Sequence, residues 1–206
     1  MADGGTIQIA NHRALEQNVS LHDVLGMVKE ARTKGGVTVP IVLMGYYNPI
    51  LAYGESKLTA DAAEAGVDGF IVVDLPPEHA GPFVTLCDTH GLAYVPLAAP
   101  TTDDSRFETI AKVAKGFLYC VSVTGVTGAR TELPPDLPEF LARVRKHVGQ
   151  ETPVAVGFGL STKEHVAAVG SFADGVVMGS AVIRALEAGG VEGMKTFLKG
   201  VVPQRA

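Results

Sequence analysis

The chain has 206 residues, of which 47% are hydrophobic and 19% are charged, and its formal net charge is −5. This composition predicts one globular domain with enough apolar material for a core. No cluster of Lys and Arg stands out, which argues against nucleic acid as a partner. The sequence also shows neither an apolar run of about 18 residues nor a signal-peptide pattern, so we expect a cytoplasmic protein with no membrane partner.

The cysteines and histidines do not indicate a metal site. Cys87 and Cys120 match neither a Cys-x-x-Cys motif nor the spacing of zinc ligands. Cys87 falls in a predicted helix and Cys120 in an apolar strand, so we expect two buried thiols. The six histidines are scattered along the chain. We therefore predict no metal ion.

The first part of the chain is predicted to be a loop followed by two helices. In the loop, residues 1–8, the two glycines after Asp3 give this carboxylate freedom to reach a ligand, although Asp-Gly-Gly is also a common turn. A helix is expected over 7–17. A second helix begins after Ser20, a favourable N-cap with Asp23 three residues later.

Strands and helices then alternate along the rest of the chain. The six expected strands cover 39–44, 70–73, 92–97, 117–121, a run from Val154 to Gly157, and a run that ends at Met178. The helices between them are expected over 55–65, within 78–90, from about 103 to 114, up to about 148, and after each of the last two strands, with a final helix and frayed tail over 191–206. Pro82 fits its helix only in the first turn.

This alternation predicts a parallel α/β sheet that is buried on both faces. No Gly-x-Gly-x-x-Gly follows the first strand, which disfavours a dinucleotide-binding fold. Polar residues and glycines instead gather where the strands end, as they do in a TIM (βα)8 barrel. Six βα units are two fewer than a closed barrel needs. We therefore expect residues 1–206 to form a single, N-terminally truncated (βα)6 portion of a barrel, with its first and last strands as open edges.

Two glycine-containing turns follow the last two strands. The first holds Gly157, Phe158 and Gly159, and the second holds Gly179 and Ser180. Glycines allow a ligand to approach the backbone closely, and the N–H groups at a helix start favour an anion. The alternative is that these are ordinary tight turns between strand and helix. Because two such turns follow successive strands, we favour a phosphate site.

Six motifs together resemble the tryptophan synthase α subunit, and most closely the α-like part of the bifunctional fungal enzyme. They cover almost the whole chain and occur in the family's order. The motifs are Ala-Asp-Gly-x-Thr-Ile-Gln at 2–8, Pro-Ile-Val-Leu-Met-Gly-Tyr-Tyr-Asn-Pro at 40–49, Gly-Val-Asp-Gly-Phe-Ile-Val-Val-Asp-Leu-Pro-Pro-Glu at 66–78, Ser-Val-Thr-Gly-Val-Thr-Gly-Ala-Arg at 122–130, Gly-Phe-Gly-Leu-Ser at 157–161 and Met-Gly-Ser-Ala at 178–181.

The resemblance implies a (βα)8-barrel lyase that cleaves indole-3-glycerol phosphate to indole and glyceraldehyde 3-phosphate by a retro-aldol step. Such a reaction calls for two carboxylates in separate environments. Asp3 matches the loop aspartate that engages the indole N–H, and Gly5 replaces a proline usual in that loop. The family's glutamate on the second barrel strand has no counterpart here.

The resemblance also implies roles for other residues. Tyr46 and Tyr119 match tyrosines that line the pocket, although each alone could be a half-buried aromatic at a sheet end. Thr127 and Gly128 match the mobile loop that closes over substrate. The two glycine turns match the family's phosphate site. Asp74 is either a site residue or a turn former, and we favour the turn.

In the family, indole passes to a β subunit or fused β domain that carries pyridoxal phosphate. The resemblance therefore implies a β partner and no cofactor for this chain itself. Two functions remain open. One is the α-type lyase, which the motifs favour. The other is a catalytically impaired remnant that binds only a phosphate ligand or a β partner, which the absent glutamate favours.

Overall fold

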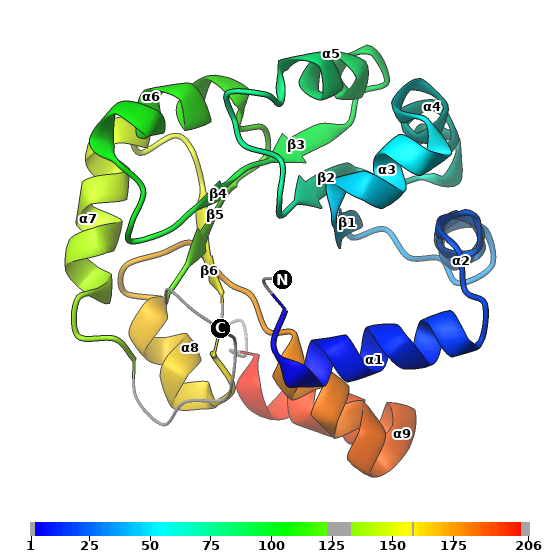
Figure 1. The fold of residues 1–206 in the computed structure, drawn as a ribbon. Coiled ribbons are helices and arrows are strands. Elements are labelled where there is room, and N and C mark those ends of the chain that lie inside the picture. Colours follow the sequence, from blue (N-terminus) through cyan, green and yellow to red (C-terminus); the bar gives the residue numbers. More distant parts are fainter. Residues whose placement is uncertain (1–2, 123–132, 158, 203–206) are drawn as a thin grey trace.

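The computed structural model describes residues 3–122, 133–157 and 159–202. Strands and helices alternate over most of this length, and helices surround the strands in Figure 1. The helices of the described part are α1 (Gly5–Glu16), α2 (Leu21–Thr33), α3 (Tyr47–Tyr53), α4 (Glu55–Ala65), α5 (Gly81–Thr89), α6 (Asp104–Val113), α7 (Leu137–Val148), α8 (Lys163–Val169) and α9 (Ser180–Val201).

The strands form two parallel sheets, with the orders β1-β2-β3 and β4-β5-β6-β7. All six predicted strand positions are confirmed, but the third holds two short strands on either side of Pro96. Proline has no N–H to donate, so it interrupts the ladder. The strands are β1 (Val42–Gly45), β2 (Gly69–Val72), β3 (Ala93–Val95), β4 (Leu97–Ala98), β5 (Leu118–Val121), β6 (Val154–Gly157) and β7 (Gly175–Val176).

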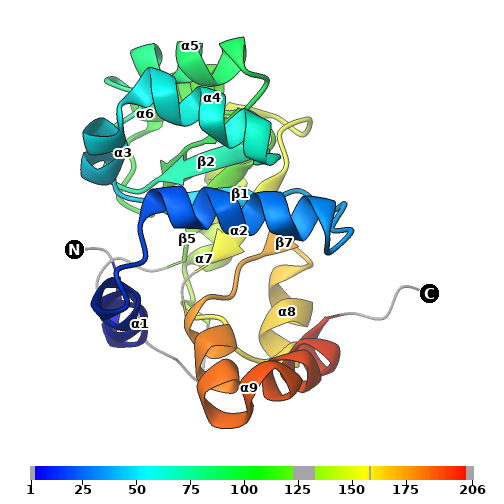
Figure 2. The same ribbon diagram turned by 90° about the vertical axis from the view of Figure 1, so that its right-hand side faces the viewer.

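Strands β1 and β7 are the ends of this arrangement. Within the described residues, β1 pairs with β2 alone and β7 with β6 alone, which confirms the two predicted open edges. Figure 2 shows α2 lying across the outer face of β1, where Leu25 and Val28 join the apolar core. The parallel strands with outer helices confirm the α/β fold class and fit part of a barrel.

Several helix ends form as the sequence predicts. The Ser20 hydroxyl accepts a hydrogen bond from the Asp23 N–H at 3.3 Å, and the Asp23 carboxylate accepts one from the Ser20 N–H at 2.8 Å. Helix α4 ends at Gly66, whose φ of 88° is a left-handed conformation that suits glycine. Pro82 lies in the first turn of α5, as expected.

Two helices differ from the prediction. Helix α3 occupies a segment expected only as the turn after the first strand; Pro49 is tolerated because it lies in the first turn. Helix α9 covers both helices predicted after Ser180, and they meet at a kink with non-helical angles at Gly189 and Gly190. The predicted tail, 203–206, lies outside the described residues.

The apolar core has an inner part enclosed by the strands and two outer parts beneath the helices. The inner part contains Ile71, Val95 and Tyr119, which come from three different strands. Cys87 and Cys120 are both buried and free, so the expectation of two buried thiols is confirmed. Burial raises the pKa of each thiol to about 12, so both stay protonated at neutral pH.

Candidate functional site

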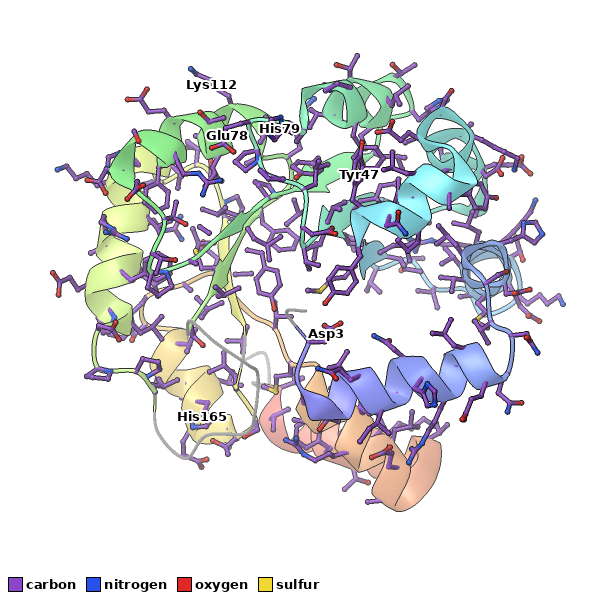
Figure 3. All side chains as sticks on the ribbon, in the orientation of Figure 1. Asp3, Tyr47, Glu78, His79, Lys112 and His165 are labelled. Carbon is purple, nitrogen blue, oxygen red and sulfur yellow. The ribbon has the colours of Figure 1, made fainter. Side chains whose placement is uncertain are left out.

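Two of the predicted site residues form a hydrogen-bonded pair at the carboxyl end of β1. The Tyr46 hydroxyl donates to the Asp3 carboxylate at 2.9 Å, and both groups are partly buried. These residues are 43 positions apart in the chain. In Figure 3, Asp3 lies near the middle of the ring of strands and helices, above α1. The Gln8 side chain of α1 donates to the Asp3 carbonyl at 2.7 Å, which fixes the loop that carries Asp3.

The turn that carries Tyr46 is held from two sides. The Asp74 carboxylate accepts a hydrogen bond from the Tyr47 N–H at 2.7 Å, at the start of α3. The Tyr47 hydroxyl donates to the Glu55 carboxylate at 2.6 Å. Burial, together with this bond, raises the pKa of Tyr47 to about 12, so the hydroxyl remains a donor. Asp74 therefore caps a helix that presents Tyr46.

Tyr119 lies against the first glycine turn. Its side chain is on β5 and is 3% exposed, and burial raises its pKa well above the usual value for tyrosine. A Cβ atom at Gly157 would lie 2.7 Å from the Tyr119 Cζ, closer than real side chains approach. Gly157 thus makes room for the Tyr119 ring. The close approach predicted for a ligand at this glycine is, in this structure, an approach by the protein itself.

The other glycines of the two turns differ from Gly157. Gly159 has a φ of 82°, a left-handed conformation that favours glycine. Gly179 has a negative φ, is exposed, and a Cβ there would meet only the Ile7 Cδ1 at 3.6 Å. Neither backbone strain nor crowding therefore requires glycine at 179. Ser180 follows as the first residue of α9, and its side chain is partly exposed.

The amino-terminal segment connects the carboxyl ends of the two edge strands. Asp3 binds Tyr46, which follows β1, while Ile7 lies beside Gly179, which follows β7. The Arg13 guanidinium on α1 also forms an ion pair with Glu187 on α9. Because β6 and β7 are parallel neighbours, the turns that follow them lie at the same carboxyl end of the sheet.

Three of the predicted site residues, Thr127, Gly128 and Phe158, lie outside the described residues.

Asp74 lies in a turn, as the sequence predicted, but its bond to the Tyr47 N–H was not anticipated, and His165 was missed altogether. His165 is buried on α8, and its Nδ1 accepts a hydrogen bond from the Ser161 N–H at 3.2 Å. Its position three residues after the N-cap Thr162 was the available signal, since that position often holds an acceptor for the preceding backbone. Among the described residues, no three His, Cys, Asp or Glu side chains gather in a way that could hold a metal ion. No helix in the same residues is both long and apolar enough to span a bilayer.

The sequence is similar to known proteins over most of its length. The sequence profile described as "Tryptophan synthase alpha chain" matches residues 1–201. Tryptophan synthase from Saccharomyces cerevisiae is 52% identical over 183 residues, which are 89% of this chain and 26% of the yeast protein. The tryptophan synthase alpha chain of Geobacter sulfurreducens is 49% identical over 187 residues, which are 91% of this chain and 69% of that protein.

A solved structure gives the same answer for the fold. The tryptophan synthase complex from Pyrococcus furiosus contains a chain that is 39% identical to this one, with a TM-score of 0.85 over 98% of this chain and 79% of that chain. The profile match and the high identity of the Geobacter sulfurreducens relative both cover most of the sequence. The chain therefore belongs to the tryptophan synthase alpha chain family.

Proposed function

We propose that the barrel to which this chain belongs cleaves indole-3-glycerol phosphate to indole and glyceraldehyde 3-phosphate. The family is one of lyases in tryptophan biosynthesis. The observation that carries the proposal is the hydrogen bond from Tyr46 to Asp3 at 2.9 Å. It holds a carboxylate at the carboxyl ends of the strands, where barrel enzymes place their chemistry.

The reaction adds one proton and removes another. An acid protonates the indole carbon that carries the glycerol chain, and a base removes the proton of the neighbouring hydroxyl. The carbon–carbon bond then breaks, its electrons return to the indole ring, and the hydroxyl carbon becomes the aldehyde. Asp3 accepts the indole N–H and stabilises the positive charge that the ring gains on protonation. The Tyr46 hydroxyl donates a hydrogen bond to the Oδ2 atom of the Asp3 carboxylate and so orients it.

The phosphate of the substrate is assigned to Phe158, Gly159, Gly179 and Ser180, beside Gly157. Three observations support this. The two turns follow neighbouring parallel strands, and the first segment of α9, before its kink at Gly189, begins at Ser180. The rest of the chain leaves room for a Cβ atom at Gly179. The close approach of a bound group would therefore explain why glycine occupies this position. Tyr119 forms the wall beside Gly157, and Thr127 and Gly128 belong to the loop that covers the substrate.

The general base is assigned to a further strand that lies between β7 and β1. The two open edges support this assignment, and so does the greater length of the relatives, since the chain spans 69% of the Geobacter sulfurreducens protein and 26% of the yeast protein. Without the base, the rate is expected to fall by about 10²–10⁴-fold. The same open edges favour the second candidate: residues 1–206 alone bind a phosphate ligand or a β partner and have negligible lyase activity.

The β partner and the place of the reaction follow from the family. The Pyrococcus furiosus structure is described as a tryptophan synthase complex. We assign this chain to an equivalent pairing in the cytoplasm, in which the partner binds pyridoxal phosphate and this chain binds no cofactor.

The test is an indole-release assay on residues 1–206 and on a version with two more βα units before Met1. We expect negligible turnover by the first protein and robust turnover by the second. Circular dichroism of both proteins separates loss of folding from loss of chemistry. Robust turnover by residues 1–206, abolished by Asp3→Asn, would show that the base lies within this chain.

A further inference from the structure

We infer that His165 is a positioning residue for the anion-binding turn between β6 and α8. This inference rests on the proposed function, which assigns that turn to the substrate phosphate. The side chain is 6% exposed, and it is one of four buried polar side chains in the described part of the protein.

His165 binds the turn through two hydrogen bonds. The backbone N–H of His165 donates to the hydroxyl of Thr162, the N-cap of α8, at 3.2 Å. Its Nδ1 accepts from the Ser161 N–H, also at 3.2 Å. Since Nδ1 is the acceptor, the neutral ring carries its proton on Nε2. The imidazole thus fixes the backbone of the residue just before the helix cap.

The residues on the other side of Ser161 are fixed as well. Leu160 is buried in the same apolar cluster as Val169, one helical turn after His165 on α8. Gly159 holds a left-handed conformation with a φ of 82°. The turn is therefore anchored by one apolar side chain and one imidazole. A rigid turn presents its N–H groups without a cost for ordering them when the anion binds.

A neutral acceptor suits this position. At the exposed start of α2, the Asp23 carboxylate, also three residues after its N-cap, accepts from the N–H of the N-cap residue Ser20. A carboxylate at position 165 would place a negative charge close to a proposed phosphate and would repel it. The imidazole accepts from the partly buried Ser161 N–H without that charge. Loss of the acceptor would leave this N–H unpaired and allow the turn to move.

The experiment compares three variants with the wild-type chain in calorimetric titrations with inorganic phosphate. His165→Leu removes the acceptor, whereas His165→Asn keeps one, because Asn Oδ1 lies as many bonds from the backbone as His Nδ1. Val28→Ala is the matched control, since it weakens the packing of α2 in the other outer apolar cluster and leaves both the Ser161 bond and the packing of Leu160 in place. Melting temperatures are measured for all four proteins.

We expect His165→Leu to bind phosphate about threefold to tenfold more weakly and His165→Asn to stay within about twofold of the wild type. Val28→Ala should lower the melting temperature and leave phosphate affinity unchanged, which separates positioning from general stability. Hydrogen exchange of the Ser161 amide should be slow in the wild type and in His165→Asn, and fast in His165→Leu.

Equal phosphate affinity of the wild type and His165→Leu overturns the inference and leaves the proposed function standing. An Asn variant as weak as the Leu variant also overturns it. Failure of the wild-type chain to bind phosphate overturns the proposed phosphate site itself, and the positioning role with it. These outcomes distinguish the two failures.

Discussion

At the amino ends of the strands, two arginines satisfy backbone and acidic acceptors, whereas at the carboxyl ends glycines and hydroxyls are found. Arg32 donates to the carbonyls of Gly66, Val37 and Val39 and to the Asp68 carboxylate. The carboxyl ends carry Tyr46, Gly157 and Gly179, among others. The charges at one end are neutralised within the chain, while the other end keeps groups that suit a ligand.

The arginine arrangement occurs twice. Arg145 on α7 donates to the Thr152 carbonyl at 2.7 Å and to Asp174, and Asp174 also accepts from the Val154 N–H at 2.7 Å. Asp68 likewise accepts from the Ile41 N–H at 2.6 Å. In both cases an aspartate that precedes one strand holds the start of the neighbouring strand. The amino ends thus hold bonds that stabilise the fold, and we expect the carboxyl ends to serve function.

The largest effect is expected at the carboxyl end. In the version with two added βα units, Asp3→Asn should lower kcat by about 10²–10⁴-fold, because the substituted amide lacks the charge that stabilises the protonated indole ring. Tyr46→Phe removes only the orienting bond and should lower kcat by about tenfold. Steady-state indole release measures both. If either variant melted well below the unsubstituted protein, the Asp3–Tyr46 pair would also stabilise the fold. The two ends of the strands would then not differ in role.

Gly157→Ala should destabilise the protein although it lies at the carboxyl end. The new methyl group would overlap the Tyr119 ring, and overpacking of this kind costs about 1–3 kcal/mol of the free energy of unfolding. Gly179→Ala is the control, because its methyl group meets only Ile7 at an ordinary distance, so stability should change by less than about 0.5 kcal/mol. Urea denaturation measures both changes. Equal destabilisation would contradict the different roles of the two glycines.

Arg145→Met should lower the free energy of unfolding by on the order of 1 kcal/mol, since it removes the bonds to Thr152 and Asp174 but keeps most of the apolar stem. The estimate is modest because Asp174 is half exposed and solvent screens the ion pair. Phosphate affinity should remain that of the wild type. A loss of affinity would show that the amino ends are coupled to the anion site.

The smallest effect is a pH dependence at Asp174. The Val154 N–H, and then Arg145, hold the pKa of this carboxyl below its ordinary value of 3.8. The resulting stability is present above pH 3.8 and is lost as the pH falls through the lower folded-state pKa. The stability difference between the wild type and Asp174→Asn should therefore shrink on acidification below about pH 4. Denaturation curves at several pH values test this. In the Arg145→Met background, Asp174→Asn should change the free energy of unfolding by less than it does in the wild type.

The sequence predicted the order of strands and helices because that order depends on local patterns. Ser20, Gly66 and Pro82 act on neighbouring backbone, so their effects could be anticipated. Helix α3 could not, since its first N–H is capped by Asp74, which is 27 residues away. Pro96 was visible as a poor strand residue, but its position between two sheets depends on the partners of β3 and β4.

The candidate site was less predictable from residues alone. Asp3 and Tyr46 were selected through the resemblance to a family, because no spacing rule relates residues 43 positions apart. Gly157 was singled out for the close approach of a ligand, whereas its close neighbour in the structure is the Tyr119 ring, a contact between adjacent strands that only the fold reveals. The assignment of phosphate to the two turns stays a prediction.

The interruption at Pro96 has a consequence for how the molecule opens. Apart from bonds such as that from the Lys115 N–H, just before β5, to the Tyr94 carbonyl of β3, each sheet has its own ladder and its own outer apolar cluster. Cooperative units of opening often follow such divisions. The half that contains β1 to β3 and the half that contains β4 to β7 are therefore expected to exchange their amide hydrogens as two blocks. The Asp3 carboxylate is bonded to Tyr46 of the first block and the glycine turns belong to the second, so a bound substrate would add a link between the two units beside the one that the amino-terminal segment already makes.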